Sequence, residues 1–431
     1  MIINAEDAVT PKSEFASGWL VVVGTFLGLA VSASAIPFYT TGMFMQPLQA
    51  DMDWGSKWIA FVASMFSLTI ALASPIAGVL VDRFGIVRPA LVGYLVMVAA
   101  YFGLSRLGSS PYHYLLLQLA IALIGSTTSP VSFLRAVNQM FVRHKGLALG
   151  LGYSGLAVTA TLAPSLVEKV IRTAGWRQAY LQIALVIAVI APIALLAIWL
   201  GQRHVRSGKV PNAVSSELQP GDRGWHFLRT KAFILCAGAF LILAISIGGY
   251  VIHLPAILAE VGIDTRRAAA IQGSLGLAIL IGRVVTGALV DRLFAPYVLC
   301  AFSILTGAGL VLLAYGGSGF VLPAALLIGL SIGAEGDVVS YLTARYFGIR
   351  HYGRVYGCLY AVFAIGLGTS PMAIGAVAAV SSYHFAIIAS AGLLMAAAGL
   401  FALLPAFPKT AHLSDSGAGG ELSEKQIEVI N

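Results

Sequence analysis

The side chains that could do chemistry in this sequence are the few charged ones inside long apolar stretches. Arg283 lies eight residues before the pair Asp291-Arg292, about 12 Å along a helix. If that pair marks the membrane surface, Arg283 lies near the middle of a hydrocarbon core about 30 Å thick, where arginine keeps its charge. Its helical face also carries Gln272 and small residues, so it should look inward. Such a guanidinium either meets an anion or is tied to backbone carbonyls or a carboxylate, and we favour the anion.

Glu335 and Asp337 are the carboxylates predicted at membrane depth, since Asp337 lies ten residues before Phe347. A carboxyl at that depth can carry a proton, as a proton-coupled carrier requires. It can equally pair with an arginine of a neighbouring helix, and both interpretations stay open. Because the two residues are two positions apart, they point to different faces of a helix, so at most one should couple transport to protons.

Other polar side chains in apolar stretches have two interpretations each. Arg135 lies six residues, about 9 Å, from the basic end of its stretch. It could reach the membrane surface in a structural or gating role, which we favour, or provide a second anion contact. His253, on one face with Tyr250, is either a packing residue or a cavity group that handles protons. Tyr39 and Thr40 follow Pro37, where we expect a kink lined with hydroxyl groups. The candidate substrate-binding set is Arg283, Tyr39, Thr40, Tyr250, His253 and Gln272.

The composition identifies an integral membrane protein. Apolar residues make up 58% of the 431 residues and charged residues only 10%, against about 25% charged in soluble domains. The net charge of +8 does not suggest nucleic-acid binding, because the basic residues lie in short loops. No nucleophile–base pair or metal-ligand cluster emerges, so we expect neither an enzyme nor a cofactor or metal.

The elements that position these residues are twelve predicted transmembrane helices in an all-α fold. They divide into two bundles of six. The predicted domains are an N-terminal segment 1–17, a first bundle 18–201, a linker 202–230, a second bundle 231–407 and a tail 408–431.

The loop charges predict the orientation in the membrane. The termini, the linker and the loops on their side hold 17 of the 26 Lys and Arg residues, and the opposite loops hold 7. Because positive charge favours the cytoplasmic side, we expect a multi-pass protein of the cell (inner, cytoplasmic) membrane with both termini cytoplasmic. We also expect a monomer.

The two bundles repeat each other in sequence. Gly78-Val-Leu-Val-Asp82-Arg83 is matched by Gly287-Ala-Leu-Val-Asp291-Arg292, an offset of 209. Gly146, Gly150 and Pro164 are matched by Gly353, Gly357 and Pro371, each at an offset of 207. Near-constant offsets predict a duplicated six-helix unit, as in transporters whose halves rock around a central site.

Asp82-Arg83-Phe84-Gly85, with Arg88 five residues after Arg83, resembles the cytoplasmic signature of the major facilitator superfamily. In that family this loop joins helices 2 and 3 and helps to close the cytoplasmic side. The resemblance implies a gating or structural role for Asp82, Arg83 and Arg88, and the repeat gives Asp291 and Arg292 the matching place in the second half. With Arg135, which joins them because of its depth in its stretch, the candidate gating or structural set is Asp82, Arg83, Arg88, Arg135, Asp291 and Arg292.

Several stretches resemble the branch of monocarboxylate transporters and oxalate/formate antiporters: 141–150, 333–341 with 345–348, and 352–357. Arg283 falls where relatives in that branch hold an arginine that meets the substrate carboxylate. This chain departs from the branch pattern where Phe38 follows Pro37 in place of a lysine, and where Ile279 replaces an aspartate. The lysine that oxalate exchangers carry in helix 11 is also missing. A single fixed cation fits one carboxylate better than two.

We therefore expect a secondary transporter that moves a small organic anion, favouring a monocarboxylate, by alternating access. It would be driven by a proton gradient or by exchange, since the sequence has no GxxxxGK[ST] phosphate loop. The alternative is a proton-coupled exporter of drugs or cations that uses Glu335 or Asp337. A ligand sensor that transports nothing is a third, weaker hypothesis.

Overall fold

The computed structural model describes residues 11–54, 56–206, 225–263, 265–333 and 335–408, and the regular structure in these ranges is helical. Nine of the described helical stretches are long and apolar enough to cross a membrane. Three shorter apolar helices, Glu14–Ala30, Lys231–Ile247 and Ser274–Val290, lie where the first, seventh and eighth spans are predicted. Nine and three together match the twelve spans that the sequence predicts.

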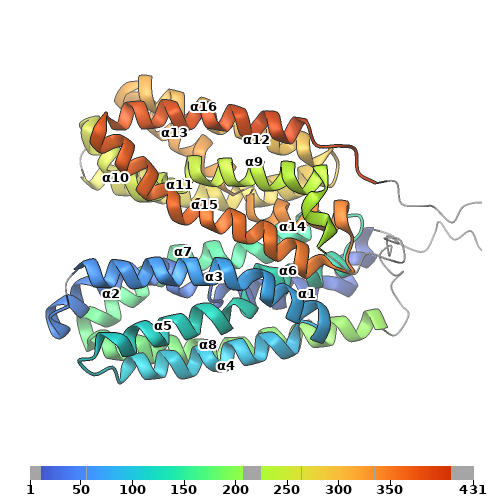
Figure 1. Ribbon diagram of the computed structural model, residues 1–431, viewed down its shortest axis with the longest axis horizontal. Coiled ribbons are helices and arrows are strands. Elements are labelled where there is room, and N and C mark those ends of the chain that lie inside the picture. The colour runs from blue at the N-terminus through green and yellow to red at the C-terminus, as the bar shows by residue number, and fades with distance from the viewer. Residues whose placement is uncertain (1–10, 55, 207–224, 264, 334, 409–431) are drawn as a thin grey trace, which may run out of the picture.

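The helices form two halves, which lie one above the other in Figure 1. The first half contains α1 (Pro11–Ala30), α2 (Ile36–Met52), α3 (Ser56–Phe84), α4 (Val87–Ser105), α5 (Pro111–Gly125), α6 (Pro130–Met140), α7 (Lys145–Ala174) and α8 (Trp176–Arg206). The second half contains α9 (Lys231–Ile247), α10 (Tyr250–Glu260), α11 (Thr265–Val290), α12 (Ala295–Tyr315), α13 (Gly317–Ile332), α14 (Glu335–Phe347), α15 (Tyr352–Val380) and α16 (Tyr383–Ala402). The halves contact each other through α3 and α15 and through α7 and α11. The predicted domain limits remain a prediction.

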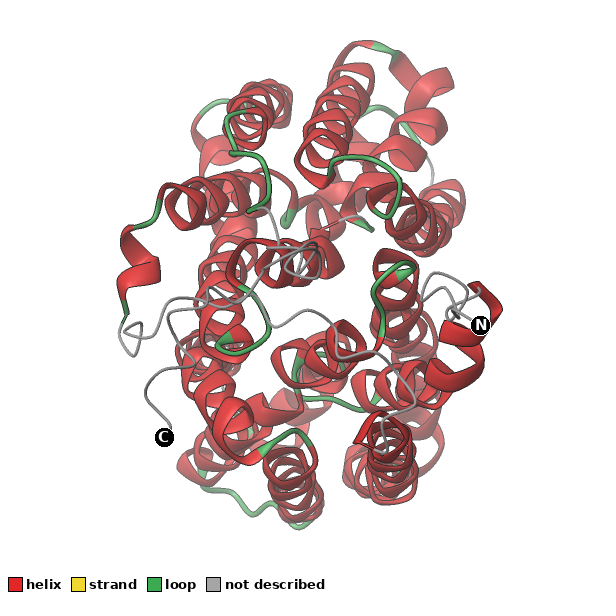
Figure 2. Ribbon diagram, turned by 90° about the vertical axis from the view of Figure 1, so that its right-hand side faces the viewer, coloured by secondary structure: helices red, strands yellow, loops and turns green. Residues whose placement is uncertain are grey.

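One end of the molecule carries the connection between the halves, and we call it the linker end. There α8 ends at Arg206, and the short helix η3 (His226–Arg229) precedes α9. Figure 2 looks onto this end, where most helices are seen nearly along their axes. α8 has 31 residues, about 46 Å of helix, so it is longer than a hydrocarbon core about 30 Å thick.

Four spans are each built from two helices, and these spans are the first, fourth, seventh and tenth. The breaks lie at residues 31–35, at the 3-10 turn η2 (Ser126–Thr128), at Gly248-Gly249 and next to Gly333. The sequence predicted a kink only in the first span, at Pro37, which lies in the first turn of the second segment of that span. Half-helices lining a cavity are typical of transporter binding sites, because their ends offer unpaired backbone groups.

Glycines let the two halves cross closely near the linker end. Gly78 of α3 faces Gly353 of α15, and Gly146 of α7 faces Gly287 of α11. In each pair a Cβ atom would overlap the carbonyl oxygen of the opposing glycine. The motifs that recur at constant offset along the sequence therefore meet each other, across the halves, in three dimensions.

Candidate functional site

Arg283 is buried in α11, against α7 of the other half. The residue is 7% exposed, and its Cζ atom lies 4.4 Å from the ring centroid of Tyr153 in α7. Its Nε and Nη1 atoms have no hydrogen-bond partner among the described residues. A cation over an aromatic face is partly stabilised, yet a buried guanidinium still requires acceptors. An incoming anion would supply such acceptors, and anion binding at Arg283 stays a prediction at this point.

Glu335 and Asp337 lie in the first turn of α14 and are 3% and 2% exposed. Oε1 of Glu335 makes no hydrogen bond within the described part of the chain. The Asp337 carboxyl makes none with good geometry there, and it interacts with the backbone amides of Asp337 and Val338 at the start of its own helix. Both carboxyls interact electrostatically with Arg283, and none of the described ion pairs within 4.0 Å joins them to it. A Cβ placed on Gly150 would lie 3.4 Å from Oδ2 of Asp337, so this carboxyl faces α7 of the other half.

Tyrosine hydroxyls surround this charged group. Tyr39 of α2 interacts electrostatically with Arg283, and substrate binding by Tyr39 stays a prediction. The hydroxyl of Tyr356 donates to the Gly336 carbonyl at 3.4 Å, and that of Tyr360 lies 3.3 Å from Ser34 Oγ of the other half. Sequence reasoning missed Tyr153, Tyr356 and Tyr360. The four-residue spacing of the last two on α15 was a signal that could have found them.

Three other predicted site residues bond to their own half in this structure. Thr40 donates to the Ile36 carbonyl at 2.7 Å, and Tyr250 donates to the Ala386 carbonyl at 3.3 Å. His253 uses both ring nitrogens: Nδ1 lies 3.0 Å from the Tyr383 hydroxyl and Nε2 lies 2.9 Å from the Pro371 carbonyl. The side chain of Gln272 lies outside the described residues. Substrate binding by these four residues remains a prediction.

Two carboxylates fasten the halves together at the linker end. Asp82 accepts from the amides of Gly353 and Arg354, both at 3.0 Å, at the start of α15. Asp291 accepts from the amides of Gly146 and Leu147, at 2.6 and 3.0 Å, at the start of α7. A carboxylate at a helix N-terminus satisfies free amides and the helix dipole. Burial raises the pKa of Asp291, and its two amide donors partly oppose that shift.

The predicted arginines of this region fall into two groups. Arg135 is part-buried, donates to the Val81 carbonyl and places Nη2 3.5 Å from Oδ1 of Asp82. That contact supports the structural or gating interpretation over a second anion contact. Arg83, Arg88 and Arg292 are exposed, and Arg83 lies over the ring of Phe84 at 5.2 Å.

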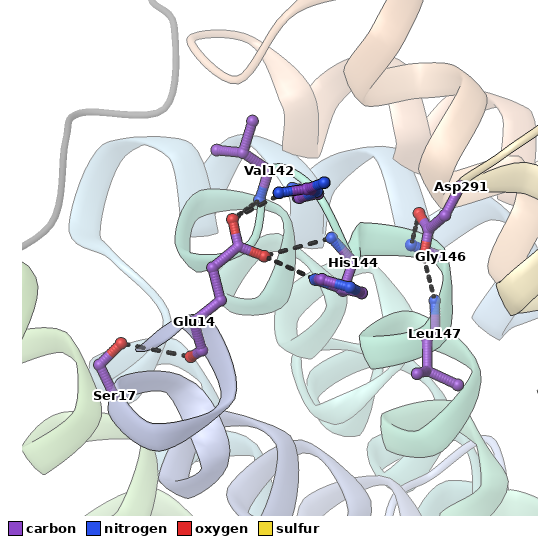
Figure 3. Close-up of polar contacts among 8 residues, drawn as sticks. Glu14, Ser17, Val142, His144, Gly146, Leu147 and Asp291 are labelled. Carbon is purple, nitrogen blue, oxygen red and sulfur yellow. Dashed lines mark hydrogen bonds and ion pairs between the residues drawn. The ribbon is translucent and has the colours of Figure 1, made fainter. Parts of the chain in front are cut away.

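Glu14 holds the loop that precedes α7, a contact the sequence did not suggest (Figure 3). One carboxylate oxygen accepts from Val142 and Arg143, at 3.4 and 3.1 Å. The other accepts from the His144 amide at 3.2 Å and lies 3.4 Å from its Nδ1 atom. The start of α7 is thus held by one carboxylate from each half, Glu14 and Asp291.

A buried hydrogen-bond network also joins the halves. Nδ2 of Asn138 in α6 donates to Ser340 Oγ at 2.8 Å and to the Tyr352 hydroxyl at 3.3 Å. Ser340 and Tyr352 contact each other at 2.6 Å. With the two carboxylate contacts, this network joins the halves near the linker end.

Comparisons with known proteins give a family and a fold. The sequence profile described as Major Facilitator Superfamily matches residues 22–337. Monocarboxylate transporter 13 of Rattus norvegicus is 25% identical over 417 residues, covering 93% of this chain and 91% of the relative. The uncharacterized MFS-type transporter YhjX of Escherichia coli is 23% identical, covering 83% and 88%. The Fujikurins efflux protein of Gibberella fujikuroi is 25% identical, covering 54% and 48%.

Solved structures share the architecture at low sequence identity. The E. coli fucose:proton symporter FucP superimposes with a TM-score of 0.68 at 15% identity, covering 91% of this chain and 100% of that chain. The proton:xylose symporter XylE gives a TM-score of 0.69 at 13% identity, covering 92% and 97%.

Proposed function

We infer that this chain, which belongs to the Major Facilitator Superfamily, carries a small organic anion of the monocarboxylate class at Arg283. Membership of that family makes it a multi-pass membrane transporter and not an enzyme. The single observation that carries this proposal is the buried guanidinium. Two of its nitrogens lack acceptors among the described residues. A carboxylate would supply two acceptor oxygens in a planar arrangement that matches the guanidinium.

The surroundings of Arg283 favour a small substrate with one carboxylate. The guanidinium is the cation that the described site offers, and it is backed by the Tyr153 ring on one side. Nearby Glu335 and Asp337 would repel a second carboxylate unless they were protonated. The similarity to monocarboxylate transporter 13 supports the same substrate class.

Transport would follow from opening and closing the two ends in turn. The linker end is held by Asp82, Asp291 and the Asn138 network, so these contacts must break before substrate can pass that side. We place the linker end in the cytoplasm because positive charge gathers there. The Asp82 and Asp291 contacts are equivalent in the two halves, which suits a rocking motion about the central site.

Proton coupling is assigned to Asp337 rather than Glu335. Asp337 faces α7 across the boundary between the halves, where a change of state alters its surroundings most. An unprotonated Asp337 would offer Arg283 an internal counter-charge. Protonation would remove this competitor and favour substrate binding.

Uptake into proteoliposomes tests the substrate class. We expect wild-type protein to take up a labelled monocarboxylate, and Arg283→Lys to lose most uptake, because lysine cannot make the planar two-point contact. The exposed Arg172→Lys variant is the matched control and should transport normally. Equal uptake by Arg283→Lys and wild type would contradict the assignment.

The second candidate function is proton-coupled export of a drug or other cation. Two buried carboxyls that join none of the ion pairs among the described residues favour it, and the Fujikurins efflux protein is a relative with an export function in its name. This function predicts that the double variant Glu335→Gln/Asp337→Asn abolishes drug resistance in cells. It also predicts that Arg283→Gln leaves resistance intact, whereas the carboxylate proposal makes Arg283 essential for transport.

A further inference from the structure

A basic pocket lies at the linker end of the first half, away from the central site. It has a volume of about 360 Å³, at the small end of the range for ligand pockets. It lies between the end of α3, the start of α4 and the end of α8. Its lining residues are Phe84, Gly85, Ile86, Val87, Arg88, Trp199, Gln202 and Arg203.

The polar lining of this pocket suits an anion. It contains the two arginines Arg88 and Arg203 and the amide of Gln202, and none of the described lining residues is acidic. The Arg203 guanidinium carbon lies 3.4 Å from the ring centroid of Trp199, which orients that side chain beside the pocket. Arginine forks match the oxygens of a phosphate group.

The pocket lies at the depth of phospholipid headgroups. Three membrane-spanning stretches meet there: one ends at Phe84, one begins at Val87 and one ends at Arg203. The adjoining surfaces of α4 and α8 expose large apolar side chains, including Leu91, Leu95 and Leu196. Such surfaces can be covered by acyl chains. Trp199, 40% exposed, is the residue type that favours the membrane interface.

We propose that this pocket binds the phosphate group of an anionic phospholipid, with Arg88 and Arg203 on the phosphate and the acyl chains along α4 and α8. The lipid would tie the end of α8, which leads into the linker between the halves, to the loop that joins α3 and α4. This site is independent of the substrate at Arg283. A soluble phosphate compound has the same anionic chemistry and is separated from the lipid by the test below.

Native mass spectrometry of the delipidated full-length protein tests the proposal. The protein is titrated with phosphatidylglycerol, phosphatidylcholine or inorganic phosphate. We expect phosphatidylglycerol to bind most tightly, and its affinity to fall about 25-fold in Arg88→Gln/Arg203→Gln, since each arginine near an anionic surface contributes roughly a fivefold factor. Arg88→Lys/Arg203→Lys should retain most of the affinity, because the charge is kept.

The matched control is Arg106→Gln. Arg106 is also an exposed arginine over an aromatic ring, with its guanidinium carbon 5.5 Å from the Phe102 ring centroid, and it lies at the opposite end of α4. It should bind phosphatidylglycerol like wild type. A different result would be that wild type binds inorganic phosphate as well as phosphatidylglycerol, and that only the double glutamine variant loses this phosphate binding. The ligand would then be a soluble phosphate compound and not a lipid. Phosphatidylglycerol binding that is equal in wild type and the double glutamine variant would overturn the proposal.

Discussion

At the scale of single residues, the centre of the molecule is defined by one buried arginine and two buried carboxyls. Arg283, Glu335 and Asp337 stand out because each is a charged side chain in an apolar stretch, and the structure brings all three together. Tyr153 could not be predicted as the partner of Arg283, because the two lie in different halves and a tyrosine in a membrane helix is unremarkable by itself. Side-chain pairing across the halves depends on helix packing that no local pattern specifies.

The ring under Arg283 should contribute to substrate affinity. A cation–π contact is worth about 0.5–2 kcal/mol, so we expect Tyr153→Leu to raise the KM for uptake roughly 2- to 30-fold. Tyr153→Phe keeps the ring and should stay close to wild type. Concentration-dependent uptake in proteoliposomes measures both variants. A Tyr153→Phe variant as impaired as Tyr153→Leu would show that the hydroxyl, and not the ring, is required.

Asp337 should govern the response to protons. Asp337→Asn removes the titrating carboxyl that faces α7, so we expect uptake that no longer depends on an imposed pH gradient, while exchange of labelled for unlabelled substrate continues. The matched control is Glu335→Gln, two residues away and equally buried, which should keep the gradient dependence. Loss of the dependence in Glu335→Gln alone would reverse the assignment.

At the scale of elements, the sequence predicted the spans well and their interruptions poorly. The fourth and tenth spans read as continuous apolar stretches, yet both break at mid-span, at η2 and next to Gly333. Pro130 begins α6 and the pair Gly248-Gly249 separates α9 from α10, so the local causes are visible in retrospect. Hydropathy windows of about 19 residues average over such breaks and cannot show them.

Asp82 and Asp291 should each protect only the helix start that they contact, α15 and α7 respectively, from hydrogen exchange. Hydrogen-exchange mass spectrometry of Asp291→Asn should show faster exchange at the start of α7, where Gly146 and Leu147 lose a charged acceptor. Asp82→Asn should do the same at the start of α15. Its effect should be larger, because it also leaves part-buried Arg135 without its counter-charge. Unchanged exchange at both helix starts would contradict the role given to these contacts.

At the scale of the whole molecule, the fold was predictable because a membrane imposes few solutions. Every span must satisfy its own backbone, so apolar length alone predicts helices and their number. The repeated glycine and aspartate motifs predicted the two related halves, and the structure shows these motifs packed against each other. Identity of the substrate was not predictable, because it depends on the shape of the space that the helices leave between them.

The orientation of the molecule can be tested with single cysteines in a variant whose Cys236, Cys300 and Cys358 are replaced by serine. A cysteine at Arg172, in the solvent-exposed last turn of α7, should react with a membrane-impermeant maleimide in intact cells. A cysteine at Arg292, at the linker end, should react only after the cells are broken. The reverse pattern would place the linker end outside.

The most direct test of the central claim is a thermal-shift screen of the purified protein against mono- and dicarboxylates, repeated on Arg283→Gln and on the exposed-arginine control Arg172→Gln. A ligand that binds only the folded state raises the free energy of unfolding, by about 2.7 kcal/mol at a hundred times its Kd, and so raises the apparent Tm. We predict a shift with monocarboxylates that disappears in Arg283→Gln and persists in Arg172→Gln. A monocarboxylate shift of equal size in Arg283→Gln would show that the anion binds elsewhere and would contradict the account.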